Sequence, residues 1–279
     1  MFVTIDLDGV LIQNPFGSGV FPEIRRLVTP ALIALGHDER EAGARVMARI
    51  REGHRRRLRA GDLVGAYDWD AIVNEAAAEF GYDRPIDVAG LVRKHCVPEH
   101  IAAYDDVERA LGYLRSRFHR VFWLSNGYHR YQYPVLEALG LVRYFDGGFA
   151  PDTHGAAKPS TGLFLAAAKA AGCPPETGLH IGDTLSHDVA GARRSGMRVI
   201  WIDRSLDPEW QGYARAAGGD PFDGFVQFTQ ERVRREECYE VYDLSLPEEC
   251  LPDAAIATLD QLPPALDALW GDGFLGQAR

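Results

Sequence analysis

The strongest constraint on the fold of this chain is an apolar run near its N-terminus that leads directly into two aspartates. Residues 2–5 (FVTI) are followed by residues 6–9 (DLDG). A short apolar run bounded by glycine predicts a buried β-strand. Alternation would place Asp6 and Asp8 on one side of it, whereas Gly9 predicts a turn that arranges both carboxylates around one point. Such a pair repels unless a shared proton or a cation separates it, and Mg²⁺, which takes oxygen ligands, is the expected cation.

Polar side chains also end two later apolar runs. Residues 121–124 (VFWL) lead into residues 125–127 (SNG), and residues 178–182 (GLHIG) lead into Asp183. Both runs are predicted to be strands. Because open α/β sheets bind ligands at the carboxyl ends of parallel strands, these polar groups are expected to meet the two N-terminal aspartates at one site.

A lysine and a further aspartate lie where two helices are predicted to begin. Lys158 stands in a KPS sequence that precedes the helical run 163–171. Asp188 follows Asp183 by five residues and precedes the helical run 189–195. We expect both side chains at the same edge of the sheet, because each helix start lies next to a strand end.

Strands and helices alternate over most of the chain. Predicted strands and helices occur at residues 106–118, 121–125, 131–139, 148–150, 163–171, 179–182, 189–195, 199–202, 254–259 and 263–269. This order predicts an α/β fold with a doubly wound parallel sheet, formed by residues 1–14 and 98–279. Residues 204–252 break the alternation and are rich in aromatic and acidic residues. We interpret them as an insertion or surface elaboration that either packs on the core or contacts another subunit.

Residues 15–97 show helical periodicity and no strand-like run. Helical runs are predicted at residues 29–35, 39–59, 69–80 and 87–95. They predict an all-helical domain inserted after the first strand. Glycine and proline occur at both crossings between this domain and the sheet, which suits hinges.

Together the motifs resemble those of the haloacid dehalogenase (HAD) superfamily of hydrolases. In this sequence they read DLDGV at residues 6–10, LSNG at 124–127, the lysine of KPS at 158, and GDTLSHD at 182–188. All four occur in the family's order and spacing. The resemblance implies a Rossmann-like core and makes residues 15–97 a cap domain of the kind placed after the first motif. One departure is the serine of LSNG, where many members carry threonine, and the hydroxyl donor is kept.

The resemblance implies separate roles for three aspartates. Asp6 is expected to be the nucleophile that attacks a phosphoryl group and forms an aspartyl-phosphate. Asp8 is expected to be the general acid and base, with its backbone carbonyl on the metal, and a plain metal ligand is its alternative role. Asp6, Asp8 and Asp183 together would hold Mg²⁺, which stabilises the charge of the transferred group.

The remaining motif residues are expected to hold the phosphate. Ser125, Asn126 and Gly127 offer side-chain and backbone donors, and Lys158 supplies a positive charge for the phosphate and the nucleophile together. Asp188 is expected either to bind the metal through water or to pair with Lys158. As alternatives, Ser125 and Asn126 would only form a strand-end turn, and Lys158 would be a solvated loop lysine. Asp188 would be a helix N-cap.

Composition limits the partners of this chain. The 279 residues carry a formal net charge of −10, which argues against general binding to nucleic acid. No stretch reaches the roughly 20 apolar residues that span a bilayer, and the N-terminus lacks the pattern of a signal peptide. Four dispersed cysteines indicate reduced thiols in the cytoplasm, although a bridge between Cys238 and Cys250 is conceivable. We expect a monomer or a homodimer.

The favoured function is a Mg²⁺-dependent phosphatase for a small phosphorylated metabolite. A haloacid dehalogenase would use the same nucleophile without metal, but Asp8 and Asp183 argue against it. A phosphomutase-type phosphotransferase shares the chemistry and is only weakly excluded. A binding or regulatory protein with an idle core is the non-enzymatic alternative, against which the complete motif set argues.

The densest basic cluster of the chain lies in the predicted helix 39–59. It comprises Arg51, His54, Arg55, Arg56, Arg57 and Arg59. One interpretation is a solvated helix face. The other is that Arg55 contacts an anionic substrate when the cap closes, in which case its neutralisation would raise KM for that substrate.

Overall fold

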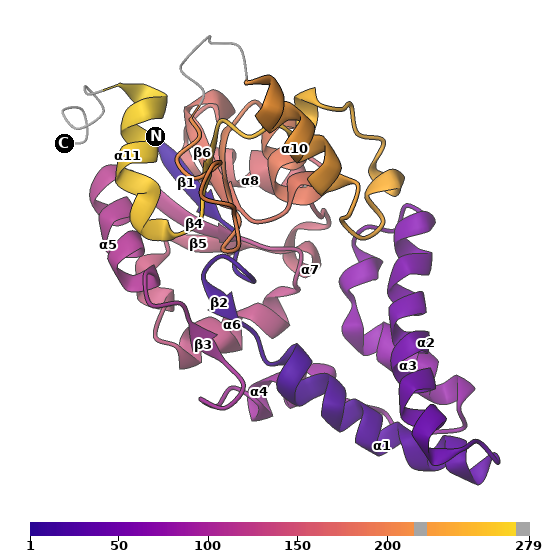
Figure 1. Ribbon diagram of the computed structural model, residues 1–279. Coiled ribbons are helices and arrows are strands. Elements are labelled where there is room, and N and C mark those ends of the chain that lie inside the picture. Colours follow the sequence, from indigo (N-terminus) through magenta and orange to yellow (C-terminus); the bar gives the residue numbers. More distant parts are fainter. Residues whose placement is uncertain (215–221, 272–279) are drawn as a thin grey trace.

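A computed structural model describes residues 1–214 and 222–271, and its centre is a six-stranded parallel sheet (Figure 1). The strand order is β5-β4-β1-β6-β7-β8. Strand β1, which carries the first motif, therefore lies between β4 and β6, which carry the second and fourth. The strands span β1 Phe2–Ile5, β4 Arg120–Leu124, β5 Gly147–Phe149, β6 Gly178–Gly182, β7 Arg198–Ile202 and β8 Ala254–Ile256. The α/β prediction with a parallel sheet is confirmed.

The register brings the motif-bearing strands level with one another. Ile5 of β1 pairs with Trp123 of β4 and with Ile181 of β6. Because all three strands run parallel, the residues that follow them emerge at the same edge of the sheet. The sheet thus places three of the predicted motifs side by side.

Side chains of the strands alternate between two hydrophobic clusters, one on each face of the sheet. In β4, Val121 and Trp123 belong to one cluster, and Phe122 and Leu124 belong to the other. The first face is covered by α5 (Val107–Arg117), α6 (His129–Ala138) and α11 (Leu262–Trp270). The second is covered by α8 (Gly162–Ala171), α9 (Ala190–Arg194) and α10 (Asp223–Val233). Helices on both faces make the fold doubly wound (Figure 1).

Four helices between the first strand and its return to the sheet form the predicted helical insertion. They are α1 (Phe21–Ala34), α2 (Glu39–Arg59), α3 (Trp69–Glu79) and α4 (Val88–Lys94). Strands β2 (Ile12–Gln13) and β3 (Ala102–Ala103) pair antiparallel at its entry and exit. We refer to α1–α4 and their connections as the cap. The exact domain boundaries at residues 14 and 98 stay a prediction.

Helix α1 is longer than the sequence pattern predicted. It begins at Phe21, whereas the expected helix began at Thr29. Buried residues at Ile24, Val28 and Leu32 follow the helical spacing of four, and Pro22 occupies the first turn, where its missing N–H costs nothing. Pro30 lies inside the helix, and this residue hid the continuous pattern.

The described part of residues 204–252 packs on the core. This agrees with one of the two interpretations given above. It contains α10, whose Phe225 and Val233 are buried in the second cluster, and Ala214 bridges to Ala254 of β8. Contact with another subunit stays a prediction. All four cysteines are free thiols, so the conceivable bridge between Cys238 and Cys250 is absent. No helix among the described residues is long and apolar enough to cross a membrane.

Replacing Phe225 by alanine tests whether this segment belongs to the folding core. The ring is fully buried, so Phe225→Ala should lower the free energy of unfolding by about 3–5 kcal/mol. Phe222→Ala is the matched control, because the Phe222 ring is 65% exposed and should cost about 0.5 kcal/mol or less. Urea unfolding followed by circular dichroism measures both. Equal effects would show that α10 does not stabilise the sheet.

Candidate active site

Asp6 lies at the carboxyl end of β1, where the chain turns out of the sheet. Its N–H donates to the carbonyl of Ile181 at 2.9 Å, so the residue is fixed beside β6. Gly9 has φ of +77°, and a Cβ there would collide with the Asp183 carboxylate. Glycine is therefore required for the close approach of the β1 turn to Asp183.

Lys158 joins two aspartates at the centre of the site. Its Nζ lies 2.8 Å from Asp6 Oδ1 and 2.5 Å from Asp188 Oδ1, and the lysine side chain is almost completely buried. Burial disfavours the ammonium, but Asp188 and Asp6 outweigh it and raise the Lys158 pKa. Asp188 thus pairs with Lys158, and its binding to a metal through water stays a prediction.

The Asp188 carboxylate is surrounded by donors. Oδ2 accepts from the Thr184 N–H at 2.9 Å and from the Thr184 hydroxyl at 2.6 Å, and Oδ1 accepts from His180 Nε2 at 2.9 Å. Burial opposes its ionisation, but Lys158 and His180 prevail and lower its pKa. His180 therefore carries its proton on Nε2, which leaves Nδ1 to accept from the Thr4 hydroxyl at 2.8 Å.

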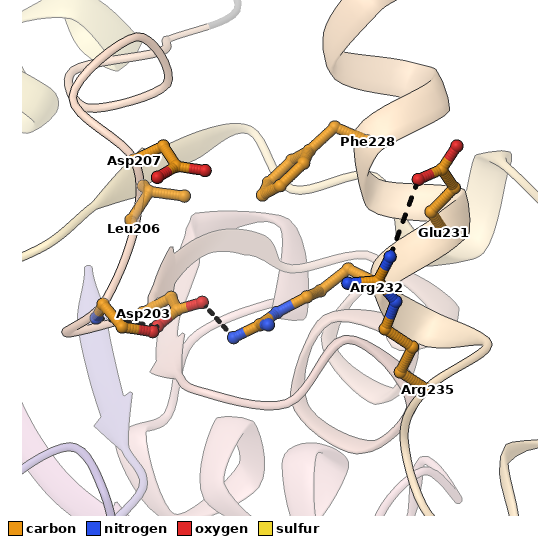
Figure 2. Close-up of a pocket in the computed structure, with 8 residues that line it drawn as sticks. Asp203, Leu206, Asp207, Phe228, Glu231, Arg232 and Arg235 are labelled. Carbon is orange, nitrogen blue, oxygen red and sulfur yellow. Dashed lines mark hydrogen bonds and ion pairs between the residues drawn. The ribbon is translucent and has the colours of Figure 1, made fainter.

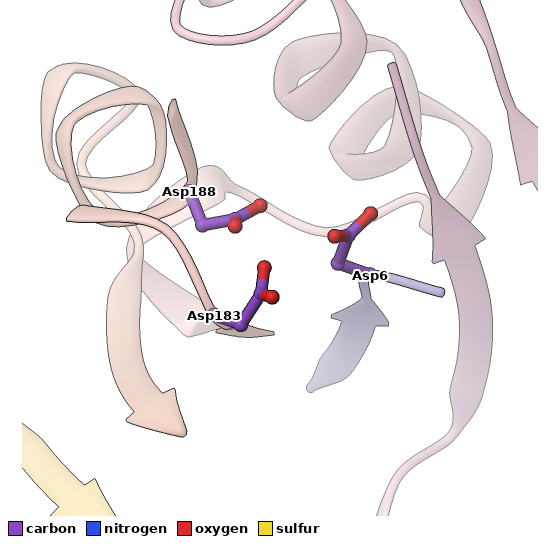
Figure 3. A group of neighbouring side chains, drawn as sticks. All are labelled: Asp6, Asp183 and Asp188. Carbon is purple, nitrogen blue, oxygen red and sulfur yellow. The ribbon is translucent and has the colours of Figure 1, made fainter. Parts of the chain in front are cut away.

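Asp183 completes a group of three carboxylates. One oxygen each from Asp6, Asp183 and Asp188 lies within 4.8 Å of the others, and Figure 3 shows the three side chains pointing toward a common point. Burial, followed by the charges of Asp6 and Asp188, raises the Asp183 pKa well above its ordinary value. No protein group among the described residues donates a hydrogen bond to its carboxylate. An oxygen-liganded divalent cation fits these residues, because it would satisfy the unpaired carboxylate and reduce the repulsion.

Burial also weakens the acidity of Asp6. Its pKa is raised to about 7, chiefly by desolvation, which Lys158 opposes and Asp188 reinforces. A carboxylate whose pKa is shifted this close to neutral pH is typical of a functional site.

The Asp8 side chain has hydrogen-bond partners of its own. Asn14 Nδ2 and Gln132 Nε2 each donate to its carboxylate at 2.6 Å. Burial raises its pKa, and the two amides partly oppose that shift. A half-buried carboxyl with raised pKa, fixed by two amides, can exchange a proton with a neighbouring oxygen.

The SNG motif forms a compact turn at the end of β4. Ser125 Oγ accepts from the Gly127 N–H at 3.0 Å, and Asn126 Oδ1 accepts from the Lys158 N–H at 2.7 Å. Asn126 Nδ2 donates to the Lys158 carbonyl at 3.1 Å. A Cβ at Gly127 would collide with Gln132. The motif therefore fixes the Lys158 backbone, a function that its spacing did not reveal.

All predicted site residues thus meet at one edge of the sheet, but several supporting residues were not predicted. Gln132 on α6, Asn14 at the start of the cap, and His180 inside β6 were missed, as was Thr184. A histidine in an otherwise apolar strand was the one available signal. Gln132 and Asn14 belong to no sequence motif, because only folding brings their side-chain amides to Asp8.

The basic cluster of α2 has carboxylate partners within the protein. Arg55 forms an ion pair with Glu237, Arg56 and Arg57 pair with Glu75, and Arg59 lies 3.5 Å from Glu52. These pairs favour the interpretation of a solvated helix face, and the substrate contact expected of Arg55 stays a prediction.

A separate cavity of about 210 Å³ contains none of the predicted site residues (Figure 2). It lies between the end of β7 and α10, and its charges largely neutralise one another. Arg232 pairs with Asp203, and Arg235 lies 3.9 Å from Glu231. These pairs leave no concentrated charge of either sign in the cavity.

Comparison with known proteins agrees with this geometry. Residues 2–196 match the model of the haloacid dehalogenase-like hydrolases. The chain belongs to this family. The match covers all four motifs, the cap and most of the sheet, so the predicted resemblance is confirmed.

Relatives in the family include named phosphatases. A phosphoserine phosphatase of Thermus thermophilus is 36% identical over 38% of this chain and 43% of its own length. A glyceraldehyde 3-phosphate phosphatase of Methanothermobacter thermautotrophicus is 28% identical over 50% of this chain and 63% of its own length. The chain thus spans less than two thirds of the length of these relatives.

Solved structures share the whole architecture. A HAD phosphatase from Thermococcus onnurineus superposes with a TM-score of 0.64 at 24% identity, covering 96% of this chain and 98% of its own. A 2-haloacid dehalogenase from Pseudomonas syringae gives a TM-score of 0.58 at 22% identity, covering 95% and 97%. Both similarities establish the fold of this HAD-family chain.

Gly9→Ala should weaken divalent-cation binding. The new Cβ would displace the Asp183 carboxylate, so we expect Mg²⁺ affinity, measured by isothermal titration calorimetry, to fall at least tenfold. Gly196→Ala is the matched control, because Gly196 has φ of +79° with no atom within 4 Å of its Cβ position. Both variants carry the same left-handed strain of about 1–2 kcal/mol. Equal Mg²⁺ affinities in the two variants would contradict the collision.

The raised pKa of Asp6 predicts a pH-dependent stability difference in metal-free protein. Between about pH 4 and pH 7 the folded carboxyl keeps its proton while the unfolded one releases it, so this group destabilises the fold as pH rises. Asp6→Asn removes that contribution. Its Tm in EDTA, relative to the wild type, should rise from pH 4 to pH 7 and then level off. Parallel Tm curves would contradict the assigned shift.

Proposed function

We propose that this HAD-family chain is a Mg²⁺-dependent phosphatase that hydrolyses a small phosphorylated metabolite. The observation that carries the proposal is the contact of Asp6 with Lys158 beside Asp183 and Asp188. A carboxylate that faces both an ammonium and a cation-binding group suits attack on a dianionic phosphate. The phosphatases named among its relatives support this reaction.

Asp6 and Asp8 share the chemistry in this proposal. An Asp6 carboxylate oxygen attacks phosphorus, the bond to the leaving oxygen breaks, and Asp8 donates a proton to that oxygen. Water then attacks the aspartyl-phosphate, Asp8 takes its proton, and phosphate leaves. Burial raises the pKa of Asp8, in the direction that favours proton donation in the first step.

Lys158 and the SNG turn bind the phosphate. Lys158 neutralises charge on Asp6 and on the incoming group, while Ser125, Asn126 and Gly127 supply donors. Asp188 holds Lys158 in place through the 2.5 Å contact. Mg²⁺, held by Asp6, Asp183 and the Asp8 carbonyl, would stabilise the charge of the transferred phosphoryl group.

The dehalogenase alternative does not account for two features of the site. It needs no metal, which leaves Asp183 as a half-buried carboxylate without a donor among the described residues. It also gives no role to Asp8, which Asn14 and Gln132 hold in place. A phosphomutase would use the same chemistry but transfer the phosphoryl group to an acceptor other than water. Analysis of the reaction products distinguishes it from a phosphatase. A cytoplasmic location and a monomer or homodimer complete the proposal.

Asp6→Asn should abolish turnover while the fold is retained. The amide keeps the shape of the carboxylate but cannot form the covalent intermediate, so phosphate release from p-nitrophenyl phosphate should fall at least 10³-fold. Malachite-green assay measures release, and circular dichroism checks the fold. More than about a tenth of wild-type activity would overturn the assignment of the nucleophile.

Metal removal provides an independent test. Chelation by EDTA should abolish activity, Mg²⁺ should restore it, and Ca²⁺ should inhibit because its looser coordination disturbs in-line geometry. Full activity after exhaustive chelation, together with chloride release from a haloacid, would replace the phosphatase by the dehalogenase.

A further inference from the structure

One short segment, residues 236–244, connects the loop after Asp183 with the cap. The Glu236 carboxylate accepts hydrogen bonds from the N–H groups of Leu185 and Ser186, each at 2.7 Å. The next residue, Glu237, forms the ion pair with Arg55 of α2. Consecutive side chains of this segment therefore contact the loop after Asp183 and helix α2 of the cap.

Apolar packing reinforces this connection. Leu58 and Ala66 of the cap form a buried cluster with Cys238 and Tyr242 of the segment. Arg194 of α9 donates to the carbonyl of Tyr242 at 3.1 Å, so the segment is also anchored to the core. In this structure the cap is packed against residues 236–244.

Tyr67 of the cap reaches the catalytic edge of the sheet. Its hydroxyl oxygen accepts from Asn126 Nδ2 at 3.0 Å. Burial raises its pKa to about 12, Lys158 opposes this shift and Asp6 adds to it, so the hydroxyl lies within electrostatic reach of both. The Tyr67 hydroxyl is also hydrogen-bonded to the Tyr242 hydroxyl. When Tyr67 accepts from both Asn126 and Tyr242, its own proton remains available for a substrate.

Tyr242 lies beside Tyr67 and faces the core. Its hydroxyl is hydrogen-bonded to His187 Nε2 at 2.7 Å, and the two tyrosine hydroxyls are close enough to shift each other's pKa. Burial raises the pKa values of both tyrosines, so both hydroxyls are uncharged at neutral pH.

The nearby cations of the cap are engaged elsewhere. Arg55 pairs with Glu237, and Arg57 pairs with Glu75. His54 stacks on Trp69 and donates through Nδ1 to the carbonyl of Ala66. A leaving group with a carboxylate would be buried against uncharged groups, which is unfavourable, whereas a hydroxyl oxygen would accept directly from Tyr67.

We propose that Tyr67 and Tyr242 determine specificity by binding a small, uncharged, hydroxyl-bearing leaving group, as in polyol and sugar phosphates. The inference rests on the proposed phosphatase function and names its substrate class. Tyr67 donates to a leaving-group hydroxyl next to Asn126. Tyr242, held by the segment that packs on the cap, closes the other side and limits the size of the leaving group.

The test compares two esters of similar size, glycerol 1-phosphate and phosphoglycolate, with p-nitrophenyl phosphate as reference. For the wild type with Mg²⁺, kcat/KM should be at least tenfold higher for glycerol 1-phosphate than for phosphoglycolate. Tyr67→Phe should reduce this preference about tenfold, as expected for one lost hydrogen bond, mainly through KM for glycerol 1-phosphate. Tyr242→Phe should reduce it less, because it removes only the hydroxyl that orients the Tyr67 hydroxyl. Tyr239→Phe is the matched control from the same segment and should leave the preference unchanged.

Three results would overturn the inference. They are a wild-type preference for phosphoglycolate, an unchanged preference in both variants, and an equal change in the Tyr239→Phe control. The wild-type comparison needs no variant to fold, and thermal melts verify the variants. Absence of phosphate release from all three esters would instead remove the phosphatase function itself. Release from p-nitrophenyl phosphate without the polyol preference would refute the specificity alone.

Discussion

The ammonium of Lys158 holds this site together, because it lies between two of the three clustered carboxylates. With Nζ 2.8 Å from Asp6 and 2.5 Å from Asp188, it lets both remain buried. Removing one partner would leave uncompensated buried charge, which typically costs about 3–5 kcal/mol. Asn126 in turn fixes the Lys158 backbone through two hydrogen bonds. The remaining site geometry follows from this pairing.

Asp183 differs from Asp6 and Asp188 because it makes no contact with Lys158. Asp188 has Lys158, His180 and Thr184 as partners, whereas the Asp183 carboxylate receives no hydrogen bond from the described residues. The protein thus supplies enough positive charge and donors for one side of the site and leaves the other for a cation. The closeness of Gly9 to Asp183 keeps the β1 turn and this carboxylate together.

The described part of residues 204–252 contacts both the sheet and the loop after Asp183. Helix α10 contributes Phe225 to the core, and the following chain brings Glu236 to the loop after Asp183. Because the same stretch packs against Leu58 of the cap, it links the cap to the loop after Asp183. The exposed ion pair between Arg55 and Glu237 lies beside this apolar contact.

The sequence by itself determined the α/β fold and the helical insertion, and it predicted the residues that lie together at one edge of the sheet. Strand periodicity and the position of polar groups at strand ends are local signals, and parallel strands necessarily deliver those ends to one edge. It misjudged the start of α1, because Pro30 interrupts an otherwise helical pattern. Only the tertiary structure decided that Asp188 pairs with Lys158, that Gln132 and Asn14 hold Asp8, and that Tyr242 meets Tyr67. These contacts join residues from separate elements, and side chains brought together by folding leave no spacing in the chain.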